Sequence, residues 1–170
     1  KMNLDKSRFK ARSIKYAIND AKNSLIEPET YLDSVSSEWE ESVGLIYQNY
    51  QKALSKAGAL DFADLLYYPV KLFKEDNMVQ RKYQQRFQHI LIDEYQDVND
   101  LQIQLLDLLT FKNLFCVGDP RQSIFGWRGS DISYILEFPK KYPEHEAIFL
   151  KNNYRSSKKI IDFINKSISH

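Results

Sequence analysis

The sequence has few glycines, one cysteine, almost no net charge and no long apolar run. Its five glycines stand at positions 44, 58, 118, 126 and 129, so the phosphate-binding pattern Gly-x-x-x-x-Gly-Lys-Ser/Thr is absent from the 170 residues. No apolar stretch approaches the roughly 20 residues that a membrane-spanning helix requires, and no signal-peptide pattern opens the sequence. We therefore expect no membrane partner and no glycine-rich phosphate loop within this chain.

The charge balance and the single cysteine narrow the class of protein further. The net charge is +1 and 28% of the residues are charged, so the chain lacks the global positive field of proteins that coat nucleic acid. Any DNA binding must therefore be local. Cys116 lies in an apolar run and is expected to be a small core residue without a disulfide partner, which fits the reducing cytoplasm.

Helical periodicity dominates the first half of the chain. Apolar residues recur every three to four positions over 7–25 and 37–57, and further helices are predicted over 61–74 and 78–86. From residue 89 onward the pattern alternates between strand and helix, which indicates parallel pairing through right-handed crossovers. The predicted fold class is α/β: a partial parallel sheet with flanking helices, preceded by an all-helical subdomain.

The first predicted helix carries a run of basic side chains: Lys6, Arg8, Lys10, Arg12, Lys15 and Lys22. Such a run either forms a solvated face or contacts the phosphates of duplex DNA, and the sequence leaves both readings open. After this helix, Glu27-Pro28 predicts a break, because the residue before a proline is pushed away from helical geometry.

Three short apolar runs in the second half each end in a polar or cationic cluster. Residues 90–92 lead into Asp93-Glu94, residues 114–117 into the loop 118–131, and residues 147–150 into residues 153–157. Because ligands of open α/β sheets bind beyond the carboxyl ends of the strands, the clusters are expected at one edge of the sheet. Asp93 is suited to holding a hydrated magnesium ion, and Glu94 to orienting or deprotonating a water molecule. For the acidic pair alone, a solvated acidic loop is the alternative.

Taken together, these clusters resemble the motifs of a known enzyme family. The matching segments are Leu60-Asp61-Phe62-x-Asp64-Leu65, Asp-Glu-x-Gln-Asp at 93–97, Gly-Asp-x-x-Gln-Ser-Ile-x-x-Trp-Arg-Gly at 118–129 and Asn-Tyr-Arg-Ser at 153–156. They are similar to motifs of the UvrD/PcrA/Rep family of superfamily 1 DNA helicases. The resemblance is dense from about Ala59 to the end of the chain and looser before it.

The resemblance implies a fold and a function. Residues 1–58 resemble the later part of a helical subdomain inserted into the first RecA-like motor domain, and residues 59–170 resemble the C-terminal part of that domain, without its phosphate-binding loop. The chain is thus expected to be a fragment of an ATP-dependent 3′-to-5′ DNA helicase that is inactive alone. The implied cofactors are ATP and Mg²⁺, and the implied partners are single-stranded DNA, duplex DNA and the remaining helicase domains.

The resemblance also implies nucleotide-site roles. Asp93, together with Glu94, resembles the magnesium ligands, and Glu94 also resembles the catalytic base. Gln122 resembles the residue that senses the γ-phosphate, Tyr154 the tyrosine that stacks on adenine, and Arg155 the arginine that contacts the γ-phosphate. For the last two, a helix-capping loop with an exposed arginine is the alternative. Asp97 completes its motif or supplies a helix N-cap.

Four residues are implied to contact DNA: Phe62, Phe125, Trp127 and Arg128. Aromatic rings stack on unpaired bases, and arginine pairs with phosphate or with a nearby carboxylate. Core packing is the alternative for Trp127 and Phe62. The chain departs from the family at Phe125, where tyrosine is more frequent, and at Val98, where threonine is usual.

Two other functions remain open at this point. One is the helicase subunit of a recombinational helicase–nuclease, which shares these motifs and would be distinguished by a nuclease domain in the same gene. The other is a non-catalytic DNA-binding or scaffold protein that retains part of a motor. The absent phosphate loop agrees with the second, whereas Asp93, Glu94, Gln122 and Arg155 argue against decay.

Overall fold

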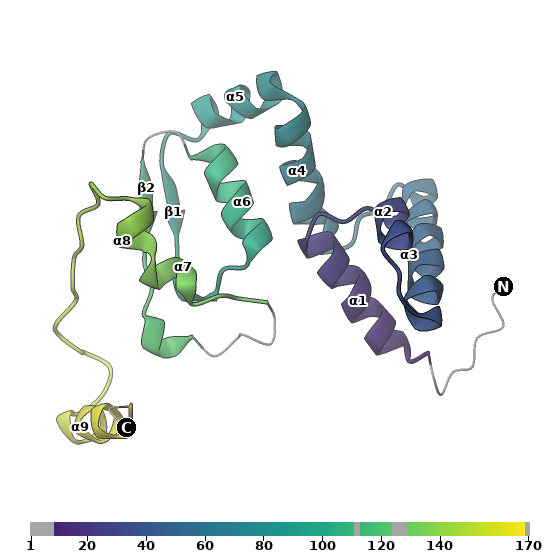
Figure 1. The fold of residues 1–170 in the computed structure, drawn as a ribbon. Coiled ribbons are helices and arrows are strands. Elements are labelled where there is room, and N and C mark those ends of the chain that lie inside the picture. Colours follow the sequence, from purple (N-terminus) through teal and green to yellow (C-terminus); the bar gives the residue numbers. More distant parts are fainter. Residues whose placement is uncertain (1–8, 111–112, 124–128, 169–170) are drawn as a thin grey trace.

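The computed structural model describes residues 9–110, 113–123 and 129–168 (Figure 1). Its helices are α1 (Ala11–Asn23), α2 (Pro28–Asp33), α3 (Glu38–Ala57), α4 (Asp64–Glu75), α5 (Asn77–Arg86), α6 (Asp100–Leu109), α7 (Ser133–Leu136), α8 (Phe138–Lys141) and α9 (Lys158–Ile168). The strands are β1 (Ile90–Ile92) and β2 (Leu114–Cys116), and two short 3-10 turns are η1 (Tyr95–Asp97) and η2 (Pro120–Gln122).

The helices α1 and α3 form the first core. Their apolar stripes meet through Ile18 and Ala21 on α1 and through Val43 and Tyr47 on α3, all of which are buried. The predicted limits of α3 are confirmed, because the Ser37 side chain accepts the Glu40 N–H at its start and Gly58 takes a left-handed conformation at its end.

The helix α2 was not predicted from the sequence. The break predicted at Glu27-Pro28 is confirmed, because α1 ends at Asn23 and α2 begins at Pro28. Pro28 lies in the first turn of α2, where the missing N–H has no helical partner to lose. The hydroxyl of Tyr47 donates to the Ile26 carbonyl at 3.1 Å, which fixes the chain as it enters α2.

The helix α4 connects the helical part to the sheet. Tyr67 and Val70 of α4 pack on Leu101 of α6 in a second core cluster, and α6 lies between α4 and the strands (Figure 1). The α6 helix begins with a reciprocal capping box between Asn99 and Gln102. The helix cap is therefore Asn99, and the suggestion that Asp97 serves as an N-cap is wrong.

The strands β1 and β2 pair in parallel, which confirms the predicted α/β class. Ile90 aligns with Leu114 and Ile92 with Cys116, with α6 in the crossover between the strands. A third core cluster around Tyr95 covers one face of the pair. On the other face Leu91 is 70% exposed, so within the described parts of the chain helices cover one side of the pair.

The third predicted strand does not form. Residues 147–150 have no regular secondary structure and belong to no sheet, and Ile148, Phe149 and Leu150 are all strongly exposed. A central parallel strand needs neighbours and apolar cover on both faces. The described residues cover one face of a two-stranded sheet, so pairing there would bury too little of this run.

Among the described residues, no helix is both long enough and apolar enough to cross a membrane. The boundary expected after residue 58 falls at the end of α3, and α1 and α4 contact one another across it. The division into two domains at this point stays a prediction.

Candidate functional site

The carboxylates of Asp93 and Glu94 follow β1 directly and are exposed to solvent. Glu94 has φ 52°, ψ 44°, a left-handed conformation that is rare for residues other than glycine. Its N–H donates to Oδ1 of Asp93 at 3.0 Å. Such a backbone conformation costs about 1–2 kcal/mol, and the surrounding contacts must hold it.

The side chain of Gln96 supplies part of that restraint. It is 1% exposed, and its Nε2 donates to Oε2 of Glu94 at 2.6 Å. Its Oε1 accepts the backbone N–H of Asp119 at 3.0 Å. One buried amide therefore connects the acidic pair after β1 to the loop after β2.

Backbone contacts bring the same two loops together. The Tyr95 N–H donates to the Val117 carbonyl at 2.9 Å. At Gly118, a Cβ would lie 2.7 Å from Oε1 of Gln96 and 3.2 Å from the backbone nitrogen of Tyr95. The close approach of the loops therefore requires glycine at position 118.

The connection continues to Gln122. Asp119 accepts the Arg121 N–H through Oδ1 and the Nε2 of Gln122 through Oδ2, both at 3.0 Å. The Ser123 hydroxyl donates to the Gln96 carbonyl at 3.3 Å. A continuous set of hydrogen bonds thus runs from Glu94 through Gln96 and Asp119 to the exposed side chain of Gln122.

Tyr154 and Arg155 are not brought to this connection. Tyr154 is 93% exposed, and Oδ1 of Asn153 accepts the backbone N–H groups of Arg155 and Ser156 in a local turn. The segment that carries them leads to α9, which lies apart from the sheet in Figure 1. Because residues 147–150 do not join the sheet, the cluster that follows them does not reach its edge. The nucleotide roles of Tyr154 and Arg155 stay predictions.

The DNA-binding candidates divide into two groups. Phe125, Trp127 and Arg128 lie outside the described residues. Phe62 precedes α4 and is 92% exposed, so its ring is not a core residue. Val98, at the family's threonine position, is 6% exposed and packs in the core cluster around Tyr95, where an aliphatic side chain leaves no hydroxyl unpaired.

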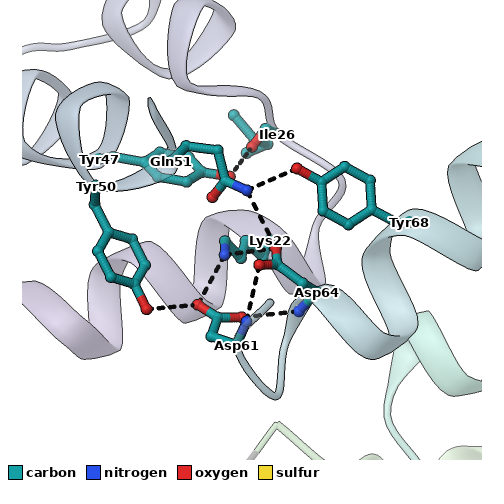
Figure 2. Close-up of polar contacts among 8 residues, drawn as sticks. All are labelled: Lys22, Ile26, Tyr47, Tyr50, Gln51, Asp61, Asp64 and Tyr68. Carbon is teal, nitrogen blue, oxygen red and sulfur yellow. Dashed lines mark hydrogen bonds and ion pairs between the residues drawn. The ribbon is translucent and has the colours of Figure 1, made fainter. Parts of the chain in front are cut away.

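Beside Phe62 lies a buried polar cluster, shown in Figure 2. Nζ of Lys22 lies 2.8 Å from Oδ2 of Asp61 and 2.7 Å from Oδ1 of Asp64, and the Lys22 side chain is 0% exposed. Lys22 therefore belongs to neither a solvated nor a DNA-facing basic surface, which corrects the expectation for this residue. Lys10, Arg12 and Lys15 are exposed and keep both readings open.

Burial and charge shift several pKa values around these residues. Burial alone would raise the pKa of the Asp61 carboxyl, but the hydrogen bonds that it accepts, first from Lys22, hold the pKa below its usual value. At the end of β2, burial raises the pKa of the Cys116 thiol to about 11. Cys116 is a free, partly buried cysteine, as expected for a core thiol.

Asp93 and Glu94 present the type of ligand that Mg²⁺ prefers. Within the described parts of the chain, no three His, Cys, Asp or Glu side chains gather as a metal-binding group. Mg²⁺ keeps several waters and binds proteins through one or two carboxylates together with substrate phosphates. Two exposed carboxylates after β1 therefore fit Mg²⁺ with a phosphate ligand better than a closed protein cage.

Comparison with known proteins places this geometry in a family. The model of the UvrD/REP helicase N-terminal domain matches residues 1–143. The chain belongs to the UvrD/REP helicase family. The match includes the Asp93–Asp97 and Gly118–Gly129 motifs, which contain most of the hydrogen-bonded connection.

Individual UvrD/REP family members agree with this assignment. ATP-dependent DNA helicase PcrA of Staphylococcus epidermidis is 44% identical over 170 residues, and PcrA of Leuconostoc citreum is 39% identical over 171 residues. PcrA of Staphylococcus aureus is likewise 44% identical. Each comparison covers 99% of this chain and 23% of the relative. The chain thus spans about a quarter of the length of these curated relatives.

Two structural contributors were missed by sequence reasoning. Gln96 was noted only as part of a motif, although its position two residues after Glu94 was a usable signal. Lys22 was grouped with the basic run, although it is in helical register with Ile18, which lies four positions earlier on the buried face of α1.

Proposed function

We propose that residues 1–170 form part of an ATP-dependent DNA helicase that moves 3′-to-5′ along single-stranded DNA and separates duplex DNA. The observation that carries the proposal is the hydrogen-bonded connection from Glu94 through Gln96 and Asp119 to Gln122. Such a connection suits an enzyme that must link a catalytic carboxylate to a second site. The PcrA relatives, which are named as ATP-dependent DNA helicases, support the same proposal.

The nucleotide chemistry follows from the exposed carboxylates. Bound Mg²⁺, with Asp93 as its principal protein ligand beside Glu94, would neutralise charge on the phosphates of ATP. The Glu94 carboxylate orients and deprotonates the attacking water. Gln122 contacts the γ-phosphate with its amide, which can donate and accept at once. Tyr154 stacks on adenine and Arg155 pairs with the γ-phosphate once their segment is brought to the site.

The DNA chemistry is assigned to the aromatic candidates. Phe62, Phe125 and Trp127 stack on unpaired bases, and Arg128 pairs with a backbone phosphate. Stacking needs exposed rings, and Phe62 meets that condition at 92% exposure. Duplex DNA is the further substrate, with Lys10, Arg12 and Lys15 as candidate phosphate contacts. We assign the activity to the cytoplasm, where a free thiol such as Cys116 is stable.

Other parts of the protein complete the nucleotide site in this proposal. We assign residues 1–58 to the helical insertion and residues 59–170 to the C-terminal part of the first RecA-like domain. The phosphate-binding loop is supplied from outside this sequence, since its glycine pattern does not occur here. The purified 170-residue chain should therefore show no DNA-stimulated ATP hydrolysis.

The decisive experiment compares Glu94→Gln with the wild type in the full-length protein. The substitution keeps the shape of the side chain but removes the base, so DNA-stimulated ATP hydrolysis should be abolished while ATP binding is retained. Glu144→Gln, at an exposed position away from both loops, serves as the matched control and should retain full turnover. Equal turnover in the Glu94→Gln protein and the wild type would contradict the catalytic assignment.

Arg155→Ala gives a second, independent test of the nucleotide site. It removes a charge-assisted phosphate contact, so both ATP affinity and turnover should fall. A loss of turnover alone would leave Arg155 outside the ground-state nucleotide complex.

A further inference from the structure

Phe62 lies inside a loop that is closed by two reciprocal hydrogen bonds. The Asp61 N–H donates to Oδ2 of Asp64 at 3.1 Å, and the Asp64 N–H donates to Oδ1 of Asp61 at 2.9 Å. The two aspartates, drawn in Figure 2, form this box at the start of α4, and residues 62 and 63 lie between them in the sequence. The backbone that carries the Phe62 ring is therefore held at both ends.

Lys22 holds both sides of this box. Its Nζ donates to Asp61 at 2.8 Å and to Asp64 at 2.7 Å, and both Lys22 and Asp64 are 0% exposed. The Tyr50 hydroxyl donates to the same Oδ2 of Asp61 that Lys22 contacts, at 3.0 Å. Moving Nζ of Lys22 away from both carboxylates would leave a buried charge without a partner, which is strongly unfavourable.

The Phe62 ring packs little against the rest of the protein. Phe62 is 92% exposed, and its neighbours Leu60 and Leu65 are 58% and 55% exposed. A large apolar ring gains no stability from such a position. The structure thus combines a buried Lys22–Asp64 ion pair with an aromatic side chain that is exposed to solvent.

We propose that Lys22, Asp61 and Asp64 form a clasp that preorganises Phe62 as a stacking platform for an unpaired base. This inference rests on the proposed function, because it assigns the clasp to the single-strand site of the helicase. A binding group that is held in its bound conformation before contact binds more tightly, because less conformational entropy is lost on binding. Lys22 and Asp61 are positioning residues that act through Phe62.

The clasp also connects two parts of the chain. Lys22 is supplied by α1, whereas Phe62 lies between α3 and α4. A displacement of α1 relative to α4 would pull Nζ away from one or both carboxylates. The orientation of the N-terminal helices is thereby coupled to the direction of the Phe62 ring.

The test uses Asp61→Ala in the full-length protein, because this substitution opens the box but leaves the buried Lys22–Asp64 pair intact. Affinity for a fluorescein-labelled oligothymidylate is measured by anisotropy for Asp61→Ala, Phe62→Ala and the double variant. Phe62→Ala should weaken binding roughly 5- to 140-fold. Asp61→Ala should weaken it several-fold, and the double variant should match Phe62→Ala within about 2-fold.

Two matched variants separate positioning from general loss of stability. Asp61→Asn keeps an oxygen that can accept the Asp64 N–H, so it should restore most of the affinity. Asp76→Ala removes a comparable pair of backbone hydrogen bonds, to Met78 and Val79 at the start of α5, and should leave affinity unchanged.

Each outcome decides a different point. Full additivity of Asp61→Ala and Phe62→Ala, or unchanged affinity in Asp61→Ala, would overturn the clasp while leaving the helicase assignment intact. Unchanged affinity in Phe62→Ala would remove the stacking platform itself. A wild-type protein that binds no oligothymidylate would refute the proposed function and this inference with it.

Discussion

The Gln96 amide donates to the Glu94 carboxylate at 2.6 Å from a position that is 1% exposed. The oxygen of the same amide accepts the Asp119 N–H. Because one end must donate and the other must accept, the positions of the amide nitrogen and oxygen are fixed. The left-handed backbone of Glu94 and this amide together set where the proposed base points. The position of the Glu94 carboxylate is therefore controlled by the loop after the neighbouring strand as well as by β1 itself.

Gln96→Leu should separate turnover from nucleotide binding. Leucine keeps the bulk but loses both hydrogen bonds, so DNA-stimulated kcat of the full-length protein should fall on the order of 10- to 100-fold through misplacement of Glu94. KM for ATP should stay near the wild-type value. Gln84→Leu, which removes a hydrogen bond to the Leu108 carbonyl, is the control and should leave kcat unchanged. Parallel losses in both variants would show that Gln96 acts only through stability.

Gly118→Ala should be more harmful to activity than Gly58→Ala. A Cβ at position 118 meets Oε1 of Gln96 at 2.7 Å, whereas nothing lies within 4 Å of one at position 58. Urea unfolding should show a loss of about 1–3 kcal/mol for Gly118→Ala. The left-handed Gly58 should cost about 1–2 kcal/mol on substitution. Only Gly118→Ala should also lower DNA-stimulated ATP hydrolysis, and equal activities would contradict the close approach of the loops.

Asp61 should contribute to the pH dependence of stability. Its pKa in the folded protein lies below its usual value, so its stabilising contribution is complete above about pH 4 and disappears as the pH falls through the folded-state pKa. Asp61→Asn should therefore lower the free energy of unfolding at pH 7, and the difference from the wild type should narrow towards pH 2. Denaturant titrations at both pH values measure this. Asp20→Asn, at an exposed position on α1, provides the control. A constant difference would show that Asp61 does not titrate with unfolding.

Trp127→Ala distinguishes stacking from core packing. If the ring stacks on bases, single-strand affinity of the full-length protein should fall by about 1–3 kcal/mol with little change in stability. If the ring is in the core, the fold should instead lose about 3–5 kcal/mol. We expect the first result, because Trp127 lies between Gly126 and Gly129 and beside Arg128. Anisotropy and a thermal melt on one preparation decide between them.

Local signals predicted much of the fold. The apolar periodicity over 37–57 predicted α3, because this signal acts within the helix itself. The strands β1 and β2 were also evident, since each is a short apolar run followed by polar residues. The run 147–150 carried the same signal and failed, because strand formation depends on a neighbour and on cover from elsewhere. Residues 28–33 were missed because a helix of fewer than two turns is too short to show an apolar periodicity.

The residues at the candidate site were predicted where the signal is local in sequence, and missed where it is not. Asp93 and Glu94 were recognisable because their motif is contiguous, and both lie where a strand end predicts them. The hydrogen bonds of Gln96 to Asp119 and of Lys22 to Asp64 join residues 23 and 42 positions apart. Local patterns do not specify such partners. Lys22 is an example: its charge suggested that it is exposed to solvent, whereas its position on α1 places it on the buried face.

The exposed run at residues 147–150 has a consequence for handling the isolated chain. Ile148, Phe149 and Leu150 are 70%, 79% and 90% exposed, in a segment that pairs with neither described strand. Such a segment is a template for intermolecular β pairing, so aggregation of the isolated chain should begin here. The charges of Glu146 and Lys151 at its two ends act as gatekeepers that slow this process.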